Sequence, residues 1–481
     1  MSLEGALKTK LILQECHFTW SLREEEDFVL CDLLNRLEEQ IQLECKEARV
    51  TRAYSSLGFV QYLYGNQQEA LANLQKSVAL AKEHYKDSDE VLIATYGDLA
   101  WLHYHMNEFS KCEDYLKELE RIRRKFSEGF TYSVEVLREK GWTFLKFSQK
   151  YYNAAKECFR RALEMNPDDS DLNAAYAIAL YRTTNDTSDS SDSSTIKQLK
   201  RAIKLDPDDA VLLVLLALRM LHNRDDRKTY ETALSKVIMA LKMSPENPHV
   251  IRYAAKFCRQ LGNMDAAISL LIEALQATPN SAFIHHQLAI CYKSKKKILE
   301  SKCAKAESDK IQQYLHKCIY HLKRAICLKP LFVVAVADLA LQYGQINNAE
   351  AERLFEEAFK MVNKEKQHLK KIHYLYGQYQ LYYKRSEQLA IYHFMQGLRL
   401  QPKSDEGKEC EKNLKKIIER RINRLKNPDD SMVCVIEGFI HEVKGEKLKA
   451  REFYEKALKN GYNLGHKTSL HKAVETLLSN I

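Results

Sequence analysis

Three cations share one face of a predicted helix in the segment VIRYAAKFCRQ, residues 250–260. Arg252, Lys256 and Arg259 follow one another at spacings that place them in a row on a helix. The opposite face is apolar and contains Ile251, Ala254, Ala255 and Phe257. No acidic residue occurs in the segment. A row of positive charges without a local counter-charge favours an anionic ligand over a merely solvated face.

Other residues suited to phosphates and bases are spread along the chain. Lys146 follows Trp142 in KGWTFLKF, and Arg182 ends YAIALYR. The segment IHHQLAICYK adds His286, Gln287 and Lys293. Each has a structural explanation of its own: Trp142 can be a core residue and Arg182 a cation at a helix C-terminus. Together, cations, aromatic rings and amides suit single-stranded nucleic acid, which is held by its phosphates and by base stacking.

An internal repeat predicts which elements position these residues. NAAKECFRRALEMNPDD, YETALSKVIMALKMSPEN and MDAAISLLIEALQATPNS each carry a small, a large and a small residue, then proline, at offsets 0, 4, 7 and 12. Ala233 and Ala267 begin the pattern in the last two copies and are 34 residues apart, the period of the tetratricopeptide repeat. Small residues let antiparallel helices approach closely. The proline ends the second helix, and the following Asp, Asn or Ser can cap the next one.

We therefore predict an all-α fold: a tetratricopeptide-repeat superhelix of about eight to ten helix pairs plus extra helices, curled around a basic central groove or tunnel. In the repeat that begins near Pro248, the three cations fall at positions 5, 9 and 12, on the concave side. We predict three subdomains of repeats: an N-terminal one (1–135), a central one that carries most of the basic groove (136–284), and a C-terminal one (285–481).

Three segments interrupt the repeat. TTNDTSDSSDSST, residues 183–195, is polar and acidic and is predicted to be a solvated loop. KSKKKILESKCAKAESDK, residues 293–310, is either a solvated linker or an added phosphate contact. The highly charged segment 405–430 is predicted to be helical.

Composition restricts the function further. The net charge of +9 over 481 residues is compatible with an anionic partner but does not identify one. The 12 cysteines form no CxxC pair and no zinc spacing, so we expect reduced thiols in the core of a cytoplasmic protein. The most apolar run, residues 210–218, is too short to cross a bilayer, and no signal peptide is recognisable. The absence of a Gly-rich phosphate loop or a nucleophile elbow predicts that the protein is not an enzyme.

An ordered set of segments resembles the interferon-induced proteins with tetratricopeptide repeats over essentially the whole chain. The set comprises ECHFTW, ATYGDLAWLHYHM, KGWTFLKF, YAIALYR, RYAAKF, IHHQLAICYK and EGFIHEVKGEKLKAREFYEKAL. The resemblance implies a cytoplasmic antiviral effector of innate immunity that sequesters single-stranded RNA bearing a 5′-triphosphate in a positively charged tunnel, without catalysis. Some members of the family accept capped RNA that lacks ribose 2′-O methylation. Self-association or association with family members is a further expectation.

The resemblance also implies roles for individual residues. The expected contacts to the 5′ phosphates are Arg36, Gln40, Lys146, Arg182, Arg252 and Tyr253. The expected contacts to the first nucleotides and their backbone are Tyr152, His249, Lys256, Arg259, His286 and Gln287. Trp142 is available to stack on a cap guanine. Asp32 aligns with an acid that some relatives use to hold a metal ion at the triphosphate, or is an ordinary surface acid; no cofactor is required, and Mg²⁺ or Na⁺ would accompany the RNA.

Several departures from the family pattern concern the cap. Asp171 stands where cap-binding relatives carry a related acid, but Glu44 replaces an apolar residue of the cap pocket. Val211 and Asp209 replace a tyrosine and an asparagine near the ribose edge. These departures favour triphosphate capture, and the retained Tyr253 argues against the branch known for AU-rich RNA. Two alternatives of other classes stay open: a repeat scaffold for acidic peptides, and an enzyme acting on RNA ends.

Overall fold

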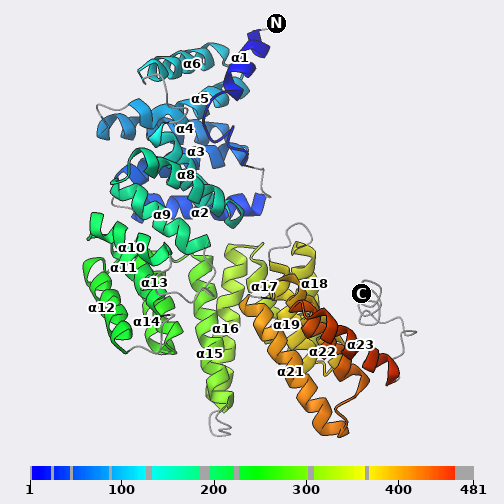
Figure 1. The fold of residues 1–481 in the computed structure, drawn as a ribbon. Coiled ribbons are helices and arrows are strands. Elements are labelled where there is room, and N and C mark those ends of the chain that lie inside the picture. Colours follow the sequence, from blue (N-terminus) through cyan, green and yellow to red (C-terminus); the bar gives the residue numbers. More distant parts are fainter. Residues whose placement is uncertain are drawn as a thin grey trace. The chain divides into compact units, whose positions relative to one another are not determined.

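The computed structural model describes residues 3–22, 27–43, 47–85, 89–125, 133–183, 194–221, 227–301, 308–362, 368–402 and 404–460, except for the side chains of 3, 27–29, 31, 32 and 43. The chain divides into two compact units, Met1–Ile284 and His285–Ile481. Each unit is built of helices that follow one another along the chain (Figure 1). In the described ranges every regular element is helical, as predicted.

The first unit opens with α1 (Leu3–Ile12), which packs on α6, and α2 (Asp27–Leu43), which packs on α3. Helix pairs follow: α3 (Glu47–Leu63) with α4 (Gln67–His84), α5 (Ile93–His105) with α6 (Phe109–Arg124), α7 (Val134–Phe147) with α8 (Tyr152–Met165), α9 (Ser170–Thr183) with α10 (Ser194–Leu205), α11 (Ala210–Met220) with α12 (Arg227–Met243), and α13 (Pro248–Gln260) with α14 (Met264–Ala277). Short 3₁₀ turns, η1 (Asp89–Leu92) and η2 (Gln149–Tyr151), precede α5 and α8.

The second unit continues the pairing. It contains most of α15 (Ala282–Ser301) with α16 (Ser308–Leu328), then α17 (Val333–Tyr343) with α18 (Asn348–Val362), α19 (Leu369–Tyr382) with α20 (Glu387–Leu400), the long helix α21 (Asp405–Leu425), and α22 (Ser431–Val443) with α23 (Lys447–Lys459). Six pairs in the first unit and four in the second confirm the predicted eight to ten within the described residues.

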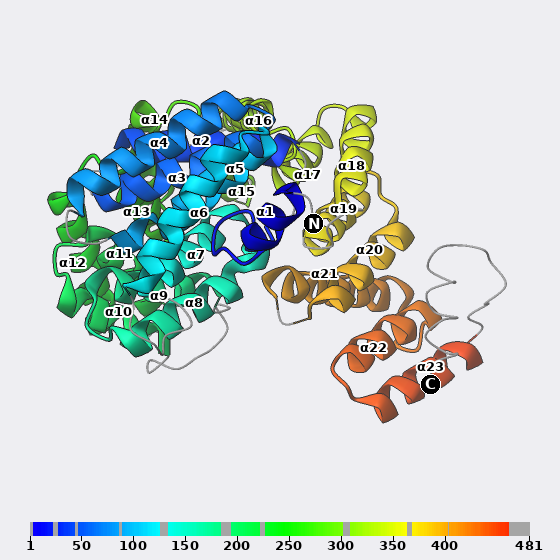
Figure 2. The same ribbon diagram turned by 90° about the horizontal axis from the view of Figure 1, so that it is seen from above.

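The first helices of successive pairs also pack on one another in the first unit: α3 on α5, α5 on α7, α7 on α9, α9 on α11 and α11 on α13. They therefore form one continuous layer, and the second helices lie outside it. In Figure 2 the pairs follow one another around a turn, so that α13 lies under α2 and α3. The charge of Arg36 on α2 influences Arg252 on α13, which places these two helices close together.

The repeat pattern works as predicted because small residues receive large ones across each pair. A Cβ added at Gly141 of α7 would lie 2.6 Å from the ring of Phe159 on α8, and one at Gly438 of α22 would lie 2.7 Å from Tyr454 on α23. Prolines follow the ends of the second helices, as Pro167 follows α8 and Pro279 follows α14. The expected caps are also present: the Asp209 carboxylate accepts from the backbone N–H of Val211 at 3.0 Å at the start of α11.

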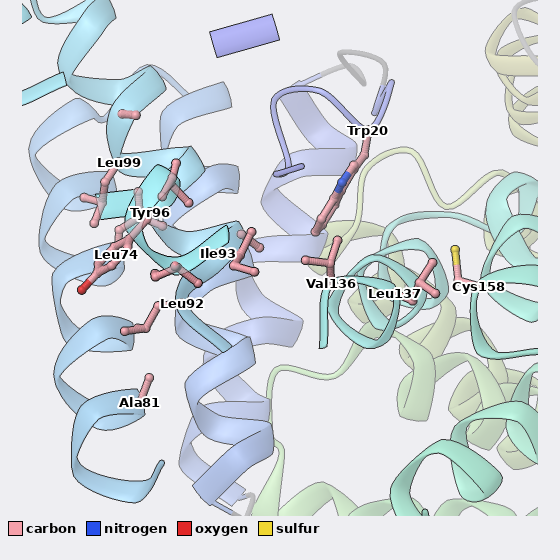
Figure 3. Close-up of a cluster of buried hydrophobic side chains, with 14 of the residues drawn as sticks. Trp20, Leu74, Ala81, Leu92, Ile93, Tyr96, Leu99, Val136, Leu137 and Cys158 are labelled. Atoms are coloured by element: carbon pink, nitrogen blue, oxygen red, sulfur yellow. The ribbon is translucent and has the colours of Figure 1, made fainter. Parts of the chain in front are cut away.

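The largest core of the first unit joins buried residues of α1, of α4 and of each helix from α5 to α9. Figure 3 shows part of it, with Leu74, Leu92, Ile93, Tyr96 and Leu99 of α4, η1 and α5 gathered around one another. The same core continues through Val136 and Leu137 to Cys158 of α8. This core spans residue 135, and the two compact units divide between Ile284 and His285.

A buried polar network ties the N-terminal segment ECHFTW to the repeats. The His17 Nδ1 atom lies 2.6 Å from Asp98 Oδ2 on α5, and its Nε2 atom lies 3.0 Å from Thr143 Oγ1 on α7. The backbone N–H of His17 also donates to Asp98 Oδ1 at 2.9 Å. All these groups are buried, so the network holds the N-terminal segment against α5 and α7, next to Trp142 in the chain, rather than offering a reactive site.

The interrupting segments differ from one another. Residues 184–193 of the predicted acidic loop lie outside the described residues. The predicted linker at 293–310 is partly wrong, since α15 continues to Ser301 and buries Lys296 at 4% exposure. The charged segment 405–430 is helical up to Leu425, where α21 ends, so the prediction of a helix holds for residues 405–425.

The described cysteines are free thiols, and all but Cys258 and Cys327 are buried, which confirms their place in the core. Among the described helices none is long and apolar enough to cross a membrane.

Candidate nucleic-acid interface

Helix α13 presents the predicted row of cations. Its N-terminus is defined by Asn247, whose side chain accepts from the backbone N–H of His249 at 2.9 Å, and by Pro248 in the first turn. The predicted apolar face is buried, comprising Ile251, Ala254, Ala255 and Phe257. Arg252, Lys256 and Arg259 are half-buried on the other side. The helix therefore divides into a core face and a cationic face, as the sequence predicts.

Positive charges from several helices converge on Arg252. Its Nε donates to the Pro248 carbonyl at 3.0 Å. Desolvation lowers the pKa of Arg252, and the charges of Arg36 on α2 and Arg182 on α9 lower it further, against the raising effect of Tyr253 and Glu39. A lowered arginine pKa means that the positive charge is held at a cost, and an anion placed there would relieve that cost.

The same positive charges act on His249. Its Nδ1 accepts from Arg252 Nη2 at 3.0 Å. Desolvation, followed by the charges of Arg252, Arg182 and Arg49, lowers the pKa of His249 to about 3. The side chain is exposed nevertheless. We name Arg36, Arg49, Arg182, His249 and Arg252 the basic cluster.

Arg182 is fixed within the basic cluster by its neighbours. Its Nη1 donates to the Leu145 carbonyl on α7 at 2.9 Å, and its guanidinium lies 5.4 Å from the ring centroid of Tyr152 on α8. Desolvation lowers the pKa of Arg182, but interactions with Tyr253 and Tyr152 raise it, and the net shift is upward. The structure thus brings Tyr152 and Tyr253 to one guanidinium, and the expected contact Lys146 directly follows Leu145 in the chain.

A second group of cations surrounds Tyr181, which the sequence analysis did not single out. Lys256 Nζ donates to the Tyr181 hydroxyl at 3.0 Å, and Arg219 of α11 lies 4.6 Å from the centre of the same ring. Tyr181 in turn meets Tyr253 edge-on at 6.2 Å between centroids. In the sequence, Tyr181 could have been found from its position next to Arg182. Arg219 could have been found from its position directly after the apolar run of α11. Charged nitrogens over aromatic faces are stabilised by the ring quadrupole.

Trp142 lies beside two arginines that the sequence analysis also missed. The guanidinium carbons of Arg49 and Arg52, both on α3, lie 6.0 Å and 5.9 Å from the centre of its ring. Asp171 on α9 pairs with both, at 3.8 Å to Arg49 and 3.3 Å to Arg52. Burial raises the pKa of Asp171, but Arg52, Arg49 and Arg138 outweigh that effect and hold it at about 2. The Asp171 carboxylate is therefore ionised and paired with these arginines.

Gln40 lies one helical turn after Arg36 on α2, and Arg259 lies near the end of α13. Two other predicted contacts lie outside the first unit. His286 and Gln287 belong to the second unit. The ring of His286 is buried there, with Nε2 3.2 Å from Asp338 Oδ2, and Lys293 Nζ donates to the other oxygen of Asp338 at 2.7 Å. The side chain of Asp32 and residue Glu44 lie outside the described residues.

Among the described residues, no group of three or more His, Cys, Asp or Glu side chains is placed to hold a metal ion. Asp209, which stands near the expected ribose edge, caps α11 and lies 3.5 Å from Arg49. Val211 is half-buried on the first turn of the same helix.

The chain resembles known proteins along nearly its full length. A family model described as "Tetratricopeptide repeat" matches residues 145–169. Protein IFIT1 homolog B of Homo sapiens is 34% identical over 467 residues, covering 94% of this chain and 96% of that protein. The antiviral innate immune response effector IFIT1 of Homo sapiens is 32% identical, with coverage of 94% and 95%. Interferon-induced protein with tetratricopeptide repeats 2 of Homo sapiens is 31% identical, with coverage of 95% and 96%.

Solved structures give the same result. The human IFIT1 dimer with PPP-AAAA has a TM-score of 0.79 at 30% identity and covers 95% of this chain and 100% of its own. The human IFIT1 dimer with m7Gppp-AAAA has a TM-score of 0.81 at 31% identity, with the same coverage. Identity, coverage and fold agree, and the chain belongs to the family of interferon-induced proteins with tetratricopeptide repeats.

Proposed function

We propose that this protein is an antiviral RNA-binding effector that sequesters single-stranded RNA by its 5′-triphosphate, without catalysis. The observation that carries the proposal is the convergence of Arg36 and Arg182 on Arg252, from three helices distant in sequence, at a partly exposed position. Mutual repulsion of these cations is unfavourable in the free protein. A triphosphate offers the concentrated negative charge that offsets it.

The surrounding groups suit the nucleotides that follow the triphosphate. Tyr152 and Tyr253 lie at Arg182, and Tyr181 lies between Lys256 and Arg219. Aromatic rings accept any base by stacking, while cations follow the phosphates, so this surface needs no particular sequence. Solved complexes of the relative IFIT1 with PPP-AAAA support the same ligand class.

The test is a titration of one short single-stranded RNA whose 5′ end is triphosphate, monophosphate or hydroxyl, at fixed salt. Each charge-assisted contact contributes about 1.5–3 kcal/mol, so the loss of two phosphates should weaken binding by at least about tenfold. Equal affinity for the three ends would contradict the proposal and indicate a nonspecific backbone track. Preferential binding of an acidic peptide would favour a protein scaffold.

We extend self-association to this chain as part of the proposal, because the relative IFIT1 has been solved as a dimer. Sedimentation equilibrium of the free and RNA-bound protein tests it, and a monomer at all concentrations would contradict it.

A further inference from the structure

The face that would hold a base next to the basic cluster is already occupied by the protein itself. Trp142 is half-buried, with its ring edge-on to Phe159 at 5.7 Å between centroids. Arg49 and Arg52 lie within 6.0 Å of the same ring centre. This separation is the range of a cation–π contact.

Both arginines are fixed by carboxylates rather than left to move. Arg52 Nη2 donates to Asp171 at 3.3 Å, and Arg49 lies 3.5 Å from Asp209 as well as close to Asp171. Asp171 also accepts from Arg138 Nη1 at 3.3 Å. The side chains of Arg49 and Arg52 are only 20% and 12% exposed. Displacing them would separate partly buried ion pairs, which is costly.

A guanine base would need these same groups. Its ring requires an aromatic face, and its N–H donors require an acceptor such as a carboxylate. Trp142 is covered by the two guanidinium groups, and Asp171 is paired with three. One pair of arginines therefore occupies both the stacking face and the acceptor that a guanine would use.

This covered surface is continuous with the basic cluster. Arg49 lies over the Trp142 ring, and its charge reaches His249 on α13. A triphosphate held by Arg182 and Arg252 would therefore lie close to Arg49, and a guanosine joined to its terminal phosphate would meet Arg49 and Arg52 if that end points toward α3.

We propose that Arg49 and Arg52 are specificity-determining residues that cover Trp142 and Asp171 and thereby exclude a 5′ cap guanosine in favour of a free triphosphate. The inference rests on the proposed function. It also distinguishes this chain from its relative IFIT1, which has been solved with Gppp-AAAA and with m7Gppp-AAAA.

The experiment compares PPP-AAAA, Gppp-AAAA and m7Gppp-AAAA on the full-length protein and on Arg49→Ala/Arg52→Ala. Asp171 keeps Arg138 in this variant, and Asp209 keeps its backbone partners at the start of α11. A newly accessible aromatic face contributes about tenfold or more to binding a stacked base. The expected result is a rise of about tenfold in affinity for the capped RNAs and a fall in the ratio of triphosphate to cap affinity. Arg49→Gln/Arg52→Gln provides a polar replacement if the alanine variant does not fold.

A mutant cycle with Trp142→Leu isolates stacking from charge. In the natural background this substitution should change cap affinity little, because the ring is covered. In the Arg49→Ala/Arg52→Ala background it should remove the gain. Arg124→Ala/Arg160→Ala, exposed positions on the outer helices α6 and α8, controls for the loss of two positive charges.

Each outcome decides the inference. If the natural protein prefers triphosphate and the double variant keeps the same ratio, the covering role is wrong while the proposed function survives. If the natural protein binds capped RNA as tightly as triphosphate RNA, the covering role is also wrong. If it binds neither RNA, both proposals are overturned.

Discussion

Arg252 and His249 form a hydrogen bond of 3.0 Å one helical turn apart on α13, with the imidazole as acceptor. An imidazole that accepts from a guanidinium at Nδ1 must be unprotonated there. The pKa of His249 is lowered to about 3 by desolvation and, in part, by the charge of Arg252, which agrees with an unprotonated imidazole. The positive charges of the basic cluster thus disfavour a proton on His249 in the free protein. This property leads to the first prediction.

Binding of a triphosphate should raise the pKa of His249, so that His249 takes up a proton when the RNA binds. Since the free-state pKa is about 3, the affinity should rise as pH falls through the window between that value and the bound-state pKa. Calorimetric titration in two buffers of different ionisation heat measures the proton uptake. The terminal phosphate itself titrates near about 6, so His249→Gln provides the reference, and equal uptake in both proteins would contradict the prediction.

Neutralising Arg252 should separate stability from binding. Its pKa is lowered by desolvation and by Arg36 and Arg182, so Arg252→Gln removes an unfavourable charge from the free protein. We expect an unchanged or higher melting temperature together with a loss of about tenfold or more in affinity for 5′-triphosphate RNA. Arg160→Gln, an exposed and ion-paired position on α8, is the matched control. A lower melting temperature of Arg252→Gln together with unchanged affinity for 5′-triphosphate RNA would contradict both parts of this prediction.

The salt dependence of RNA binding should show whether Lys256 contacts a phosphate. If this ammonium group contacts a phosphate, Lys256→Gln should reduce the slope of log K against log salt by about 0.7, the value for one phosphate of a single strand. Lys242→Gln, on the outer helix α12, should leave the slope unchanged. Equal slopes for the two variants would remove Lys256 from the RNA path.

The second unit should lose stability in mild acid through a histidine pair. His373 Nδ1 and His393 Nδ1 lie 2.9 Å apart, and desolvation is the main cause that lowers their pKa values to about 4 and about 3. The unfolded chain, with histidine pKa values near about 6.5, binds protons first. Stability is therefore complete above about pH 6.5 and falls as pH decreases toward these folded values.

Denaturation at pH 7.5 and pH 5, with a probe in the second unit, measures this loss. His373→Asn/His393→Asn should reduce the difference between the two conditions, whereas His316→Asn, at an exposed position on α16, should not. Protonation of this histidine pair cannot explain a loss that persists in the asparagine variant, so that result would assign the acid sensitivity to other groups.

Close packing of α7 on α8 should make Gly141 intolerant of a side chain. A Cβ there would lie 2.6 Å from the Phe159 ring, which also packs against Trp142. Gly141→Ala should destabilise the first unit by about 1–3 kcal/mol, and Phe159→Leu should recover part of the loss. Thermal unfolding checks both, with Asn153→Ala on the exposed surface of α8 as control.

The amino-acid sequence by itself determined the elements of this protein. The offsets of small, large and proline residues are local, so they predict the helix pairs, the start of α13 at Pro248 and its cationic face. They do so because each repeat packs mainly against its neighbours in the chain. Arg252 and Arg182 were singled out from the residues themselves and Arg36 from the family resemblance, and only the fold brings the three together.

The tertiary structure decided which charges meet and which are already paired. Arg49 and Arg52 precede Trp142 by 93 and 90 residues, and no spacing rule connects them, but the stacking of α3, α5, α7 and α9 in one layer brings both over its ring. His286 shows the converse, since a histidine expected to contact RNA is buried against Asp338 in the second unit. Electrostatic partners depend on distance in space, which a periodic pattern along one chain does not contain.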